Sequence, residues 1–201
     1  MEFIFNRSKQ TKAIIVNSIT LYRLIASFAL LYFIIQNNLT VFKWLLVVSF
    51  FTDAIDGFLA RKFKVTSILG SKFDSIADDL TILMAIIGVF KFKPGFISHE
   101  NILVFTLLGL YLVQTALALI KYKKITSFHT YLAKFAAIAQ GVFLILLFFL
   151  PEWPLGLFRI AAILTMLDLL EEIILVFMLS IWQANVKGIF WVIKNKYSIA
   201  H

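Results

Sequence analysis

The chain has 201 residues, of which 61% are apolar or aromatic and only 15% are charged, and its mean hydropathy is +0.93. A soluble domain is typically about 45–50% apolar and about 25% charged, so this composition excludes an ordinary soluble fold; it is also too apolar for a disordered chain. The net charge of +8 lies in short clusters between apolar stretches, which indicates contact with anionic lipid headgroups and not with nucleic acid. Cysteine is absent, so disulfides and thiolate metal ligands are ruled out.

The apolar stretches predict six membrane-spanning helices, because only helices or closed barrels cross lipid and these runs lack the alternation of barrel strands. The expected spans are, in chain order, residues 18–35, 40–61, 70–90, 102–120, 128–150 and 155–181. Mixed basic and apolar segments flank them at 1–16 and 182–201, and we expect both to lie on the membrane surface as amphipathic helices. The predicted fold is an all-α integral membrane protein with one domain over 1–201, and its 22 phenylalanines are expected to face lipid.

The orientation in the membrane follows from the distribution of lysine and arginine between the two sides. One side would carry only Lys43, Lys91, Lys93 and Arg159. The other side would carry Arg7, Lys9, Lys12, Arg23, Arg61, Lys62, Lys64, Lys72, Lys121, Lys123, Lys124, Lys134, Lys187, Lys194 and Lys196. Because cytoplasmic loops carry the excess of basic residues, we expect both termini to be cytoplasmic.

Four aspartates gather where the second predicted span ends and the third begins. Each acidic residue deep in a membrane helix costs about 2.5–3.5 kcal/mol on insertion scales, so four of them need a compensating partner. Asp53 and Asp56 are three residues apart, Asp74 and Asp78 are four apart, and each pair therefore shares a helix face. The short loop 62–69 makes the two helices antiparallel neighbours, so we expect the carboxylates to converge in one cleft open to water.

Four carboxylates without histidine or cysteine form a hard oxygen donor set, which suits Mg²⁺, Mn²⁺ or Ca²⁺ and not zinc. Two divalent ions would balance the four formal charges, and paired ions are a known arrangement for displacement at phosphorus. Gly57 and Ala60 would let a bulky ligand approach the backbone, and Arg61 at the rim could hold a phosphate through two hydrogen bonds.

The run Asp53-x2-Asp56-Gly57-x2-Ala60-Arg61-x8-Gly70-x3-Asp74-x3-Asp78 resembles the signature of the CDP-alcohol phosphatidyltransferases. The resemblance implies that a CDP-linked lipid, usually CDP-diacylglycerol, gives its phosphatidyl group to an alcohol while CMP leaves. It implies two Mg²⁺ or Mn²⁺ ions on Asp53, Asp56, Asp74 and Asp78, with Asp78 also the general base. It further implies CDP-lipid contacts from Asp56, Gly57, Ala60, Arg61 and Gly70, and it suggests a homodimer.

Residues at the start of the first predicted span bear on which alcohol is the acceptor. Asn17, Thr20 and Arg23 resemble the entry to the first span in the phosphatidylglycerophosphate synthase branch, although Val16 stands where that branch often has proline. With the basic rim, this favours sn-glycerol 3-phosphate as the acceptor, giving phosphatidylglycerophosphate, with contacts expected from Arg23, Lys124 and Lys134. Phosphatidylglycerol, as in a cardiolipin synthase, and inositol phosphate stay open as acceptors.

Two further alternatives concern the whole protein and its sixth predicted span. A cation transporter could use the same aspartates, and it is the alternative from a different functional class. Asp168, Glu171 and Glu172 could be ion-pair partners of Arg23, Lys72 or Lys134, or they could form a wall of the acceptor pocket. The positive-inside bias favours a bacterial inner membrane, with the active site facing the cytoplasm.

Overall fold

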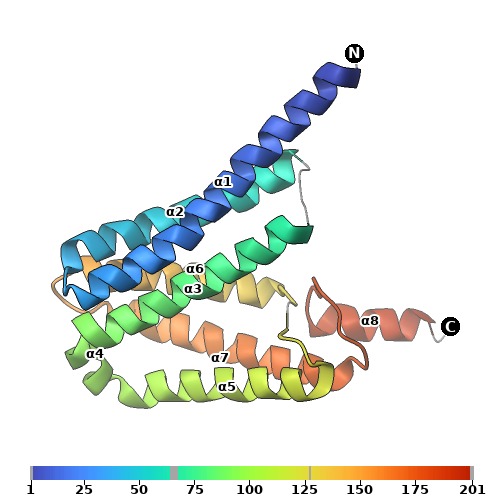
Figure 1. The fold of residues 1–201 in the computed structure, drawn as a ribbon. Helices are drawn as coiled ribbons and strands as arrows, with labels where there is room; N and C mark the ends of the chain where they lie inside the picture. The colour runs from blue at the N-terminus through green and yellow to red at the C-terminus, as the bar shows by residue number, and fades with distance from the viewer. Residues whose placement is uncertain (1, 64–67, 127, 200–201) are drawn as a thin grey trace. The chain divides into compact units, whose positions relative to one another are not determined.

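The structure is a computed structural model that describes the backbone of residues 2–63, 68–126 and 128–199. Side chains are described for 18–55, 73, 76–126 and 128–194. The elements of regular structure in these ranges are α-helices, as the sequence predicts (Figure 1). The chain forms two compact units, residues 1–95 and residues 96–201.

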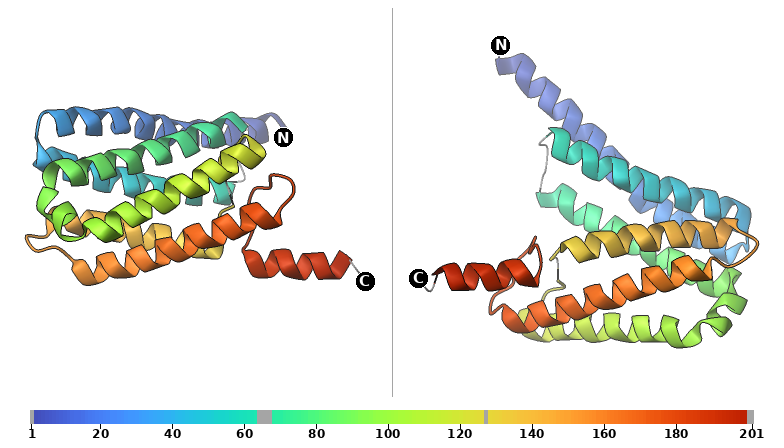
Figure 2. Two further views of the ribbon diagram at one scale, coloured as in Figure 1. Left: turned by 90° about the horizontal axis from the view of Figure 1, so that it is seen from below. Right: turned by 180° about the vertical axis from the view of Figure 1, so that it is seen from behind.

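The first unit consists of three long helices, α1 (Glu2–Ile35), α2 (Leu39–Phe63) and α3 (Ile68–Phe92). Helix α1 packs against both α2 and α3, as the ribbon views show (Figure 2). Its buried face follows helical spacing, with Arg23, Ala26, Leu30 and Ile34 each at most 5% exposed. The α1–α2 turn is closed by Asn38, whose side-chain oxygen accepts a hydrogen bond from the Val41 amide at 3.1 Å, as expected of a helix N-cap.

The second unit contains α5 (Asn101–Tyr122), α6 (Tyr131–Phe149), α7 (Leu155–Met178) and the shorter α8 (Ile189–Ile199). Helix α7 packs against both α5 and α6, and more lightly against α8 (Figure 1). The short helix α4 (Pro94–His99) precedes α5, and it was not predicted although proline is favoured at the first position of a helix. Its Phe96 packs edge-on against Phe158, with ring centroids 4.9 Å apart.

Three helices among the described residues are long and apolar enough to cross a membrane, Ser18–Ile35, Asn101–Tyr122 and Tyr131–Phe149. They agree with the first, fourth and fifth predicted spans, so the protein is an integral membrane protein with apolar helices. Helices α2, α3 and α7 have the necessary length, with 25, 25 and 24 residues, but each carries aspartate or glutamate within its apolar run. The count of six spans and the surface position of both terminal segments therefore stay predictions.

Several predicted boundaries shift for identifiable reasons. Helix α1 is continuous from Glu2, so segment 1–16 is not a separate helix; neither proline nor glycine interrupts it before the first span. Helix α6 begins at Tyr131 and not at 128, because the Thr130 side chain accepts a hydrogen bond from the Ala133 amide and caps the helix.

The expectation that phenylalanines face lipid is wrong for part of the set. Phe42, Phe96 and Phe128 are at most 2% exposed, and each lies inside the packing of its own unit. Phe28, Phe51 and others are exposed, as predicted. Composition alone does not separate the two groups, because a membrane protein uses the same apolar side chain in its core and on its lipid-facing surface.

Candidate active site

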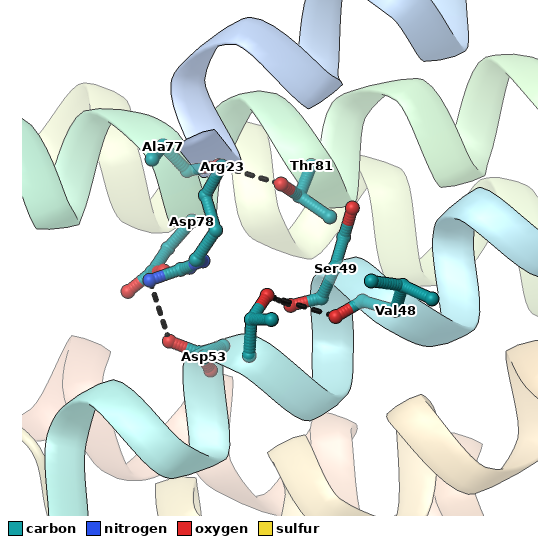
Figure 3. A network of polar contacts seen from close by, with 8 residues as sticks. Arg23, Val48, Ser49, Asp53, Ala77, Asp78 and Thr81 are labelled. Carbon is teal, nitrogen blue, oxygen red and sulfur yellow. Dashed lines mark hydrogen bonds and ion pairs between the residues drawn. The ribbon is translucent and has the colours of Figure 1, made fainter. Parts of the chain in front are cut away.

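The predicted aspartate site is built around a buried arginine contributed by α1. Arg23 is 1% exposed, and its guanidinium lies between the carboxylates of Asp53 on α2 and Asp78 on α3 (Figure 3). One guanidinium nitrogen, Nη1, is 2.9 Å from Asp53 Oδ1, and the other, Nη2, forms an ion pair with Asp78 Oδ1. The three long helices of the first unit are therefore joined at one point by charge.

The two carboxylates are only partly covered by this contact. The side chain of Asp53 is 46% exposed and that of Asp78 is 42% exposed, whereas the arginine side chain between them is 2% exposed. Asp78 Oδ1, the oxygen that faces Arg23, has almost no exposed surface. The exposed part of the Asp78 side chain is therefore turned away from the arginine.

Small polar side chains around Arg23 are hydrogen-bonded within their own helices. Ser49 donates to the Leu45 carbonyl at 2.9 Å. Thr81 donates to the Ala77 carbonyl at 2.7 Å (Figure 3). Both residues are buried, at 0% and 2% exposure. Each hydroxyl has its hydrogen-bond partner in the carbonyl four residues earlier in its own helix. These small, uncharged side chains can therefore be buried beside the arginine.

The other signature residues lie on the same two helices. Helix α2 contains Asp56, Gly57, Ala60 and Arg61, and helix α3 contains Gly70 and Asp74. The side chains of these six positions lie outside the described residues. The structure thus brings Asp53 and Asp78 together, as the spacing predicts, and the predicted roles of the other six stay predictions.

Hard carboxylate oxygens on two neighbouring helices, partly open to solvent, fit the donor chemistry of Mg²⁺ or Mn²⁺. Within the described side chains no group of three or more acidic, histidine or cysteine residues gathers to hold an ion. Two of the four predicted ligands fall outside that part of the chain, so a full ligand set would require Asp56 and Asp74 beside Asp53 and Asp78.

The acidic residues of α7 take part in a second polar network, within the second unit. Glu172 Oε2 accepts hydrogen bonds from Gln114 Nε2 at 2.6 Å and from Thr126 Oγ1 at 2.8 Å. Asp168 accepts one from Thr130 at 3.4 Å, and Glu171 accepts one from the Ile189 amide at 3.1 Å. These donors are neutral, in contrast to the lysine and arginine partners that the sequence suggested.

The basic residues predicted to bind the acceptor have different settings. The Lys124 ammonium lies over the Trp182 ring, 5.1 Å from its centroid, and the Lys134 ammonium lies 5.3 Å from the Tyr131 ring centroid. Both lysines are exposed and belong to the second unit. Lys121 instead donates to the Val176 carbonyl at 2.7 Å, close to the end of α7, where a cation is favourable. The acceptor roles of Arg23, Lys124 and Lys134 stay predictions.

The sequence reasoning missed that Arg23 is a partner of the aspartates. A signal was present, because Thr20, Arg23 and Ser27 repeat at helical spacing on one face of the first span, and all three are buried. A polar stripe on an apolar helix has to face other polar groups, and the aspartates of α2 and α3 are the matching set.

Comparison with known proteins gives the family. A family model described as CDP-alcohol phosphatidyltransferase matches residues 13–170. The chain is similar to a CDP-diacylglycerol–inositol 3-phosphatidyltransferase of Saccharomyces cerevisiae, with 41% identity over 62 residues. That match covers 31% of this chain and 28% of the yeast protein. No solved structure matches the chain. The family match spans most of the chain and includes Arg23, Asp53 and Asp78, and the chain therefore belongs to the CDP-alcohol phosphatidyltransferase family.

Proposed function

We propose that this protein transfers a phosphatidyl group from CDP-diacylglycerol to an alcohol and releases CMP. The observation that carries the proposal is the convergence of Asp53 and Asp78, one from each half of the family signature, on either side of Arg23. Two partly exposed carboxylates beside an apolar helix suit a substrate whose diphosphate is polar and whose acyl chains belong in lipid. Membership of the family supports this activity over the cation transporter.

The reaction assigns the residues the following roles. The acceptor hydroxyl oxygen attacks the phosphorus that bears diacylglycerol, and the bond from that phosphorus to the oxygen of CMP breaks. Asp78 takes the hydroxyl proton, and the partial exposure of its side chain supports this role. Gly57, Ala60, Arg61 and Gly70 bind the CDP-lipid with Asp56. Positioning and charge stabilisation dominate such transfers, so a pre-arranged carboxylate is the feature that matters most.

We further propose that Asp53, Asp56, Asp74 and Asp78 hold two divalent ions, Mg²⁺ or Mn²⁺. Bound ions would offset the negative charge of the diphosphate and of the departing CMP. The support is the oxygen donor set itself, of which the two described members lie on adjacent helices with part of each side chain exposed. A homodimer and a cytoplasmic active site belong to the same proposal and rest on the family and on the positive-inside pattern.

For the acceptor, we place an inositol-type polyol first. The support is that the similar yeast protein is named for inositol. Glycerol 3-phosphate, the acceptor expected from the sequence, is second. It is supported by the exposed Lys124 and Lys134, whereas Arg23 is already engaged by two aspartates.

The deciding experiment measures CMP release by the purified protein in detergent with CDP-diacylglycerol and Mg²⁺ or Mn²⁺. Inositol, inositol phosphate, glycerol 3-phosphate and phosphatidylglycerol are supplied one at a time. We expect release with one acceptor, loss of release on adding EDTA, and recovery on restoring the ion. Release with glycerol 3-phosphate alone would reverse our order of acceptors. If the protein released no CMP with any acceptor and also failed to bind CDP-lipid, the transporter would have to be considered again.

A further inference from the structure

Arg23 occupies an unusual position for a charged side chain in an apolar helix. It lies in the candidate span Ser18–Ile35, faces the other two helices of its unit and is 1% exposed. An arginine inside a membrane helix is costly, with about 2.5–3.5 kcal/mol as the value at the helix centre on insertion scales, and a buried one has to be offset by specific partners. Those partners are carboxylates of the proposed catalytic signature, one on α2 and one on α3.

The guanidinium of Arg23 contacts both carboxylates of the pair. Arg23 approaches Oδ1 of Asp53 and Oδ1 of Asp78, and Oδ1 of Asp78 is buried by it. More than two fifths of each aspartate side chain is nevertheless exposed. A guanidinium contact at Oδ1 restricts the orientation of each carboxylate. The planar guanidinium has five donors in a rigid fork, so it can set both carboxylates at once.

We propose that Arg23 is a positioning residue that orients Asp53 and Asp78 for the divalent ion and stays in contact with both while the ion is bound. The proposal rests on the metal site put forward above. Groups behind the ligands commonly fix ligand orientation in this way, and their loss typically weakens metal binding about 10–100-fold. The acceptor role predicted from the sequence is replaced by one behind the carboxylates.

A competing arrangement predicts the opposite change in metal affinity when Arg23 is replaced. The guanidinium could stand in the place of the ion and leave when the ion arrives. Replacing Arg23 by a neutral side chain would then remove a competitor and a positive charge, and metal binding would become tighter. Under our proposal the same change loosens both carboxylates, and binding becomes weaker even though the repulsion is gone. The sign of the change therefore separates the two arrangements.

The experiment measures Mn²⁺ affinity by electron paramagnetic resonance on the full-length protein in detergent. Arg23→Lys keeps the charge but has a single nitrogen that cannot hold two carboxylates in the same way. Arg23→Gln removes the charge. We expect both variants to bind Mn²⁺ about 10–100-fold more weakly than wild type. Arg159→Lys is the matched control, since Arg159 is paired with Glu100 at 3.3 Å in the other unit, and its affinity should equal that of wild type.

Thermal unfolding in EDTA is recorded for each variant, so that weak binding is counted only for protein that is folded without metal. An unchanged affinity in Arg23→Lys, or a tighter one in Arg23→Gln, would overturn the positioning role and leave the metal site standing. Wild-type protein that does not bind Mn²⁺ would overturn the metal site, and this inference with it. CMP release by wild type, measured separately, would still report on the transferase.

Discussion

Asp78 combines two demands that usually oppose each other in a single residue. One oxygen of its carboxylate forms an ion pair with the buried guanidinium of Arg23. The rest of the side chain is exposed enough to meet a substrate. A general base has to be held in place and has to be reachable by the acceptor hydroxyl, and this arrangement meets both conditions. Asp79, the next residue, is exposed and belongs to a different face of α3, about 100° round the helix.

Asp78→Asn should lower the rate of CMP release by about 10²–10⁴-fold, the range of a lost general base, while the protein stays folded and binds CDP-lipid. Asp79→Asn is the control, because it makes the same chemical change one residue away and should retain transfer. The measurement is CMP release under saturating acceptor, with CDP-lipid binding recorded on the same samples. Turnover at the wild-type rate in Asp78→Asn would remove Asp78 from the role of base.

Among the helices, α2 and α3 approach each other closely at Gly88. A Cβ placed on Gly88 would overlap the ring of Phe42 and would be 2.9 Å from its Cε1 atom. That ring is fully buried and packs against Phe92, with centroids 5.2 Å apart, so it has little room to move. The close approach lies about three helical turns from the aspartates on the same two helices, and it helps to fix how α2 and α3 present Asp53 and Asp78.

We therefore expect Gly88→Ala to destabilise the protein. Overpacking of a buried contact costs about 1–3 kcal/mol, which exceeds the gain in helix propensity of about 0.5–1 kcal/mol. The midpoint of thermal unfolding should fall by about 2–4 °C for each kcal/mol lost. Gly141→Ala in α6 makes the same substitution where no atom lies within 4 Å of the new Cβ, so its midpoint should stay or rise. A midpoint for Gly88→Ala at or above that of Gly141→Ala would contradict the packing argument.

Much of this element-level picture follows from the sequence, and the remainder has a common cause. Hydropathy and charge predict the helices, and the spacing of Asp53 and Asp78 predicts that α2 and α3 face each other. The sequence did not identify Arg23 as the partner of those aspartates, because that contact depends on how α1 is rotated about its axis. The burial of Phe42 likewise depends on tertiary packing. Local patterns define which residues form a helix, and long-range contacts define what each face meets.

For the whole molecule, the division into two units separates the charged groups. The first unit holds Arg23 with the signature aspartates, and the second holds the α7 acids in a network of neutral donors. Helix α6 in the second unit is a candidate span whose ends carry different charges. Lysines 121, 123 and 124 lie in and just after the last turn of α5, before α6 begins, and the acidic Glu152 follows α6. The positive-inside rule then assigns the lysine end to the cytoplasm.

The absence of cysteine makes this orientation directly testable, since any introduced thiol is the only one in the chain. Lys123 lies at the end of α5, before α6, and Glu152 lies just after α6; both are exposed, so Lys123→Cys and Glu152→Cys should not perturb packing. In sealed vesicles, a maleimide that cannot cross the membrane should label Lys123→Cys only from the cytoplasmic side and Glu152→Cys only from the other. Permeabilised vesicles provide the control for reactivity, because both thiols should then be labelled. Labelling of both from one side would mean that α6 does not cross the membrane, and the six-span arrangement would fail with it. The reverse pattern, with α6 crossing but Lys123→Cys labelled from outside, would place the basic rim and the proposed cytoplasmic site on the wrong face.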